Sequence, residues 1–243
     1  KYNKSAELGD YGQYRGLTYW SPNINIYRDP RWGRGQETYG EDPFLTAKNG
    51  CAFVEGLQGD GKFLRSAACA KHFAVHSGPE ADRHSFNAEV NDKDLFETYL
   101  PAFEMLVKRS KVESVMGAYN RVNGYPCCAH PFLIKEVLRN RWKFEGHVVS
   151  DCGALADFVN GHMVAADMNE AAAMALKGGC DLNCGGVYNN LTEAYEKDMV
   201  DESDIKTAGV RLSPQGFCSG SLKRKDPILP SRTAWLIAKS TRI

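Results

Sequence analysis

The sequence predicts an α/β domain built around a parallel β-sheet. Short apolar runs, often rich in β-branched residues, alternate with stretches whose apolar residues recur at helical spacing. One strand and one helix recur at intervals of roughly 30–45 residues, which is typical of βαβ units. The spacing fits either a barrel with long loops or a doubly wound sheet.

The predicted elements follow one another in a regular order. Five strands are expected at residues 19–26, 66–73, 112–119, 147–151 and 180–182. Helices are expected at residues 42–57, 92–109, 131–140 and 169–177. Because a complete (β/α)8 barrel needs eight strands and about 250 residues, a barrel here is expected to be incomplete, with its early strands missing.

The composition excludes several classes of protein. The chain has 243 residues, of which 43% are hydrophobic and 25% charged, as in globular proteins rather than disordered or fibrous ones. Lys+Arg and Asp+Glu both number 30, so no net basic field points to nucleic acid. No apolar run approaches the length of a membrane span, and the N-terminus lacks the apolar stretch of a signal peptide. We therefore expect neither a nucleic-acid nor a membrane partner.

A change in charge divides the chain near residue 213. Residues 213–243 contain six basic residues and one acid, so this tail carries +5 and residues 1–212 carry −5. The tail also contains Pro214, Pro227 and Pro230 and shows no clear periodicity. We predict one domain over residues 1–212 and a separate basic tail over 213–243.

The eight cysteines show no zinc-binding spacing. Buried free thiols are the favoured interpretation, and one or two disulfides are the alternative. The sequence also lacks dinucleotide, P-loop, HExxH and GxSxG motifs. No metal and no cofactor are expected.

Polar side chains follow the predicted strands, where parallel α/β folds place their sites. Asp151 follows the apolar pair Val148-Val149, and Lys71-His72 and Tyr119 end two other strands. Carboxylates, cations and aromatics suit a sugar, whose anomeric carbon needs a carboxylate. Structural alternatives remain open: Asp151 as a helix cap, Lys71-His72 as a core-edge pair, and Arg28, Arg31 and Arg34 as loop braces with Glu37, Glu41 and Asp42.

Taken together, the motifs over about residues 8–212 resemble glycoside hydrolase family 3. The resemblance rests on five segments in order: residues 20–26; residues 28–34 with Glu41-Asp42-Pro43; Ala70-Lys71-His72-Phe73; Met116-Gly117-Ala118-Tyr119-Asn120; and Val148-Val149-Ser150-Asp151. The family fold implied is the TIM-like (β/α)8 barrel.

The resemblance also implies a retaining mechanism. Asp151 matches the nucleophile that forms a covalent glycosyl-enzyme. The residues expected to bind the sugar or to lie beside the nucleophile are Arg34, Lys71, His72, Met116, Tyr119 and Cys152. The Ser-Asp-Cys sequence at Cys152 resembles β-xylosidases and α-L-arabinofuranosidases more than β-glucosidases. The expected substrate is an oligosaccharide or an aryl or alkyl β-glycoside.

The resemblance has one important gap. The family's general acid/base is usually a Glu in a domain that follows the barrel, and this chain contains no counterpart. General acid catalysis contributes about 10²–10⁴-fold, so a sugar-binding fragment with impaired catalysis is an alternative. A Schiff-base aldolase using Lys71 is a more distant one. The family also suggests a secreted or periplasmic protein.

Overall fold

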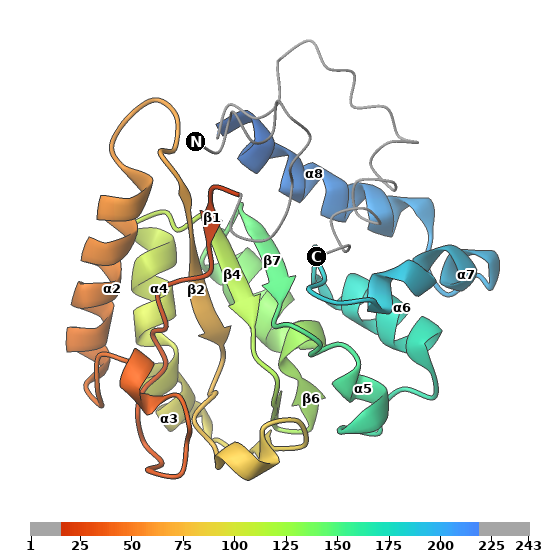
Figure 1. Cartoon of the computed structure of the whole chain (residues 1–243), viewed down its shortest axis with the longest axis horizontal. Coiled ribbons are helices and arrows are strands. Elements are labelled where there is room, and N and C mark those ends of the chain that lie inside the picture. The colour runs from red at the N-terminus through yellow and green to blue at the C-terminus, as the bar shows by residue number, and fades with distance from the viewer. Residues whose placement is uncertain (1–15, 219–243) are drawn as a thin grey trace.

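A four-stranded parallel sheet forms the centre of the computed structural model, which describes residues 16–218 and their side chains through residue 212. The strand order is β1-β2-β4-β7 (Figure 1). The strands are β1 (Thr18–Tyr19), β2 (Ala67–Phe73), β4 (Ser114–Gly117) and β7 (His147–Ser150). The predicted α/β class is confirmed, while the sheet closes into no barrel within the described residues.

Both edge strands are shorter than predicted. Regular strand pairing of residues 19–26 with β2 is confined to β1 and a bridge at Asn23, because Pro22 has no N–H to donate. The carbonyls of Ser21 and Pro22 still accept the N–H groups of Cys69 and Lys71, at 2.9 Å and 3.1 Å. The Ile24 N–H nevertheless donates to the Lys71 carbonyl at 2.9 Å, so this segment follows β2 to its end. At the other edge, Leu182 forms one parallel bridge with Val149.

Helices connect the strands in the predicted places. Residues 92–109 form one helical stretch with a wide turn at its centre, because Pro101 lacks an N–H and its ring cannot follow a regular turn. Helix α2 begins where Asp42 Oδ1 accepts the Leu45 N–H at 2.6 Å, with Pro43 in the first position. The helices are α2 (Pro43–Gln58), α3 (Asp92–Asp94), η3 (Leu95–Tyr99), α4 (Pro101–Lys108), η5 (Pro131–Arg141), α5 (Asp157–Asn160), α6 (Met168–Gly178), α7 (Leu191–Glu196) and α8 (Glu202–Cys218). Single turns are η1 (Gly35–Glu37), η2 (Glu80–Asp82), η4 (Cys127–Ala129) and η6 (Val187–Asn190).

A second, smaller sheet was not predicted. It joins β3 (Asn87–Ala88), β5 (Arg121–Val122) and β6 (Tyr125–Pro126) in that order. Strands of two residues are too short to show alternation in a sequence. This sheet ties the loop after β2 to the loop after β4, and both loops contribute to the site described below.

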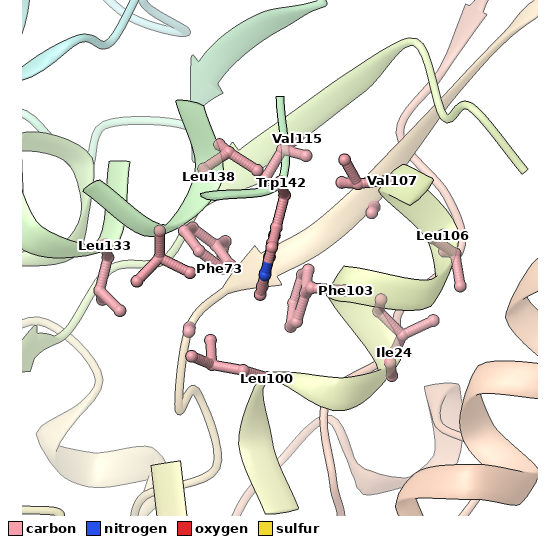
Figure 2. Close-up of a cluster of buried hydrophobic side chains, with 14 of the residues drawn as sticks. Ile24, Phe73, Leu100, Phe103, Leu106, Val107, Val115, Leu133, Leu138 and Trp142 are labelled. Atoms are coloured by element: carbon pink, nitrogen blue, oxygen red, sulfur yellow. The ribbon is translucent and has the colours of Figure 1, made fainter. Parts of the chain in front are cut away.

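The main core lies between the sheet and helices α2, α4 and η5. Figure 2 shows Phe73, Phe103 and Trp142 facing one another within this core. The Phe73 ring centroid lies 5.0 Å from that of Phe103 and 6.0 Å from that of Trp142, both in edge-to-face arrangements. On the other face of the sheet, Cys69, Met116 and Val149 form a small cluster. These two layers hold β2, β4 and β7 rigidly below their carboxyl ends.

Asp181, within the predicted strand at residues 180–182, belongs to a buried ion cluster. Its Oδ2 accepts the Val148 N–H at 2.8 Å and pairs with Arg139 at 2.8 Å, while Oδ1 pairs with Arg211 at 3.0 Å. This cluster connects α8 and η5 to β7, so we assign Asp181 a structural role.

Helix α8 runs through the predicted domain boundary at residue 212, and residues 219–243 lie outside the described part of the chain. Helices α6, α7 and α8 lie to one side of the sheet, opposite α2 and α4 (Figure 1). Within residues 16–218, no helix is both long enough and apolar enough to cross a membrane.

The aromatic cluster predicts a clear difference between two Phe→Ala substitutions. Phe103 is fully buried, whereas Phe44 on α2 is 63% exposed. Phe103→Ala should lower the free energy of unfolding by about 3–5 kcal/mol, because it leaves a cavity. Phe44→Ala should change it by less than about 0.5 kcal/mol. Urea denaturation measures both, and equal losses would contradict this account of the core.

Candidate active site

Asp151 lies at the carboxyl end of β7 and is only 8% exposed. Its backbone N–H donates to the Gly117 carbonyl at 3.1 Å, which fixes it to the end of β4. Its Oδ1 accepts the Cys152 N–H at 2.8 Å. Its Oδ2 is buried without a hydrogen bond from a described residue. One carboxylate oxygen is therefore held by the backbone, and the other is left for a ligand.

Arg34 and His72 approach this second oxygen. Arg34 Nη1 lies 3.8 Å and His72 Nε2 3.4 Å from Asp151 Oδ2. Glu37 orients the guanidinium through two bonds of 2.7 Å, from Arg34 Nε to Oε1 and from Nη2 to Oε2. Such paired bonds fix both the position and the plane of an arginine. Of the arginines expected to brace this loop, Arg34 forms the expected pair with Glu37.

Asn25 holds His72 through three contacts. The Asn25 side-chain amide donates to the His72 carbonyl, and Asn25 Oδ1 accepts the His72 backbone N–H, both at 2.8 Å. The same Oδ1 lies 2.9 Å from His72 Nδ1. Because Oδ1 can only accept, the hydrogen-bond network assigns the ring proton to Nδ1.

The other ring nitrogen, His72 Nε2, lies 2.7 Å from Arg34 Nη1. An arginine always donates, so Nε2 must accept and the ring is neutral. Burial lowers the pKa of His72 well below its usual value of 6.5, and the nearby His76 and Arg34 lower it further. The contact between His72 and Asp151 is therefore not an ion pair.

The charge on Asp151 depends on opposing effects. Burial raises the pKa of the Asp151 carboxyl above its usual value of 3.8. The Cys152 N–H lowers this pKa, and so do the positive charges of Arg34, Lys71 and Arg83. The cations thus favour the ionised form that burial disfavours.

Lys71 and Met116 lie side by side in the sheet register, but they differ in exposure. Lys71 is partly buried, and burial lowers the pKa of its ammonium, as does Arg34. Met116 is 1% exposed and packs against Cys69 and Val149. Its side chain therefore lies in the buried layer beneath the site, and its contact with a sugar stays a prediction.

Tyr119 and Cys152 lie beside the nucleophile candidate. The Tyr119 hydroxyl donates to the Cys152 carbonyl at 2.6 Å. Burial and the negative charge of Asp151 raise the pKa of Tyr119 to about 12, so its hydroxyl keeps its proton. Cys152 forms a disulfide with Cys184, whereas Cys51, Cys69, Cys127, Cys128 and Cys180 are buried free thiols. Both interpretations of the cysteines thus hold in part.

Several contributors escaped sequence reasoning. Asn25 lies in a strand-like apolar segment, where nothing in the sequence marks it as a hydrogen-bond partner of His72. Arg83 lies in the loop after β2, with its guanidinium 5.8 Å from the centroid of the Tyr119 ring. Only its place in a charged loop after a predicted strand could have indicated it. His76 is buried, with Nδ1 at 3.2 Å from Asn120 Oδ1. Within residues 16–218, no three His, Cys, Asp or Glu side chains form a group suited to a metal.

The described site combines a parallel sheet with a carboxylate, cations and a neutral imidazole at its carboxyl edge. This arrangement defines a class, the α/β domains that bind ligands where parallel strands end. The profile described as "Glycosyl hydrolase family 3 N terminal domain" matches residues 15–213. The chain therefore belongs to glycoside hydrolase family 3.

Curated relatives and solved structures agree with this assignment. The chain is 46% identical to "Xylan 1,4-beta-xylosidase" of Xylanibacter ruminicola, and the match covers 91% of this chain and 26% of that protein. It is also 46% identical to "Beta-xylosidase/alpha-L-arabinofuranosidase 2" of Medicago sativa subsp. varia, over 79% of its length and 26% of that protein. The chain thus spans about a quarter of the length of these curated relatives.

Two solved structures resemble the fold closely. One is a "GH3 exo-beta-xylosidase (XlnD)" in complex with a xylobiose aziridine probe, with a TM-score of 0.83 and 36% identity over 93% of this chain and 32% of that chain. The other is a β-glucosidase from Listeria innocua, with a TM-score of 0.78 and 32% identity over 92% of this chain and 33% of that chain.

The buried histidines predict how stability depends on pH. Burial lowers the pKa of His76 to about 3 and those of His130, His147 and His162 to about 4, and lowers that of His72 in the same direction. The unfolded chain protonates its histidines near pH 6.5, so below that pH it binds more protons than the folded chain. The free energy of unfolding should therefore fall as the pH drops from about 6.5 towards about 4.

Buried acids oppose this trend, because burial raises the pKa values of Asp151, Asp157 and Asp181 above their usual value of 3.8. Burial raises the pKa of Glu113 from 4.5 to about 6, so the folded chain takes up one extra proton between these values. Above about pH 5 the five histidines outnumber these four acids, so the net slope keeps its sign. Urea denaturation from about pH 7.5 to about pH 5 tests this, and a free energy that stays constant or rises would contradict it.

Proposed function

We propose that the chain carries the sugar-binding site and nucleophile of a retaining, exo-acting β-glycosidase. The reaction is hydrolysis of terminal β-D-xylosyl or L-arabinofuranosyl residues of xylo-oligosaccharides. The single observation that carries this proposal is the asymmetry of Asp151, whose Oδ1 is held by the Cys152 N–H while Oδ2 is buried beside Arg34 and His72 without a hydrogen bond from a described residue. A nucleophile needs one oriented, unengaged oxygen.

The proposed reaction has two steps. Asp151 Oδ2 attacks the anomeric carbon as the bond to the leaving oxygen breaks, and the electron pair leaves with that oxygen, which takes a proton from a general acid. Water then attacks the anomeric carbon of the glycosyl-aspartate, loses a proton to the conjugate base and releases the sugar. Arg34, Lys71 and the neutral His72 would bind the sugar hydroxyls, with Arg34 and Lys71 as donors and the His72 ring changing partner between Arg34 and the sugar.

The general acid is proposed to lie in a C-terminal domain of the complete protein. The relatives support this, because the chain spans only about a quarter of their length. We likewise propose that the sheet belongs to a (β/α)8 barrel and that residues 1–212 form the family domain, separate from the tail at 213–243. The family match ending at residue 213 supports this division.

A xylosidase is favoured over a glucosidase. The curated relatives named above are β-xylosidases at 46% identity, while the β-glucosidase structure is 32% identical. A β-glucosidase remains the second candidate. A sugar-binding chain without turnover is the third, and it differs from the others in forming no covalent adduct.

Covalent trapping tests the proposed nucleophile. The chain is incubated with 2,4-dinitrophenyl 2-deoxy-2-fluoro-β-D-xyloside, whose leaving group departs without protonation. One fluoroxylosyl group should appear in the intact mass and map to Asp151, because fluorine at C2 slows breakdown of the intermediate. Asp151→Asn should form no adduct.

The matched control is Asp157→Asn, which removes another buried carboxylate six residues further along the chain. This variant should still be labelled. Absence of an adduct with both the xylosyl and the glucosyl probe would contradict the proposed function, and faster labelling by the glucosyl probe would favour the second candidate.

A further inference from the structure

The disulfide between Cys152 and Cys184 joins the residue directly after Asp151 to the loop at the sheet edge. We propose that this disulfide is a positioning element of the active site, and that oxidation of the pair is required for full reactivity of Asp151. The inference rests on the proposed function, in which Asp151 is the nucleophile.

Both polar groups of the Cys152 backbone contact the site. Its N–H donates to Asp151 Oδ1 at 2.8 Å, and its carbonyl accepts the Tyr119 hydroxyl at 2.6 Å. Any displacement of this residue therefore changes the orientation of the Asp151 carboxylate and the place of the Tyr119 ring. Cys152 acts through its neighbours, so it is a positioning residue.

Packing does little to hold Cys152 in place. Cys152 and Gly153 are both exposed, and Gly153 has a φ of +80°, a conformation typical of a turn. Exposed loops move more than packed elements. The precision that a nucleophile requires must come here from bonds rather than from burial.

The bonds come from the neighbouring loop. Besides the disulfide, the Gly153 N–H donates to the Cys184 carbonyl at 2.8 Å, and the Cys184 N–H donates to Ser150 Oγ at 2.9 Å. Asn183 donates to the same Ser150 hydroxyl at 3.1 Å. The disulfide and these hydrogen bonds thus surround Asp151. They link its neighbours to β7 on one side and to the loop at Leu182 on the other.

The disulfide is the one covalent bond that joins Cys152 to the neighbouring loop, so its removal tests whether that link positions Asp151. In Cys184→Ser, and in the double variant Cys152→Ser/Cys184→Ser, the rate constant for trapping by the fluoroxyloside should fall about tenfold or more, since small misplacements cost that much in catalysis. Wild-type chain reduced with dithiothreitol under native conditions should show the same loss. Alkylation followed by intact mass confirms the redox state of the pair.

A pH profile distinguishes positioning from a general loss of stability. The Cys152 N–H lowers the pKa of Asp151, so weakening that bond should move the acidic limb of the trapping profile to higher pH. Phe103→Leu, which weakens the distant core, should leave both the rate constant and the limb unchanged at temperatures below its unfolding transition. Dithiothreitol should have no further effect on the double variant.

The outcomes separate the two claims. An equal trapping rate and an unchanged acidic limb in oxidised wild type, reduced wild type and Cys184→Ser would overturn the positioning role while leaving the nucleophile in place. A wild-type chain that forms no adduct in either redox state would overturn the proposed function and this inference with it.

Discussion

The contacts between Asn25 and His72 are the constraint on which the rest of the site depends. One amide side chain bonds the N–H and carbonyl of His72 and contacts its ring nitrogen, across 47 residues of sequence. These contacts leave His72 Nε2 as an acceptor for Arg34, and Arg34 in turn lies beside the Asp151 carboxylate. The ring orientation, the guanidinium position and the environment of the carboxylate follow from one another in this order.

The electrostatics of Asp151 reflect a compromise between burial and charge. Burial removes water that would otherwise compete for the carboxylate, and it disfavours the ionised form. Arg34, Lys71 and Arg83 favour the ionised form without any of them bonding Oδ2 closely. The result is a carboxylate that is stabilised by charge yet unengaged, which suits attack on a developing positive centre at an anomeric carbon.

The sequence predicted the helices and strands better than the contacts between them. The central strands at β2, β4 and β7 and helix α2 carry strong periodicity, so their predicted bounds agree with the structure within a few residues. The lengths of the edge strands were overestimated, in one of them because Pro22 interrupts the pairing. The small sheet with β3 was not predicted, because two-residue strands carry no pattern. Asp151, Lys71, His72 and Tyr119 were predicted because they end strands, whereas Asn25 and Cys184 act through contacts that only the fold creates.

The central proposal is that the strand ends of this chain place one ionised carboxylate, Asp151, where it can stabilise a positively charged sugar transition state. Calorimetric titration with a xylo-configured iminosugar, which is cationic at neutral pH, tests that claim without any requirement for turnover. The account predicts that the iminosugar binds at least about tenfold more tightly than neutral xylose, and that Asp151→Asn removes this preference. Equal affinity for the cation and the neutral sugar, or a preference that persists in Asp151→Asn, would contradict it.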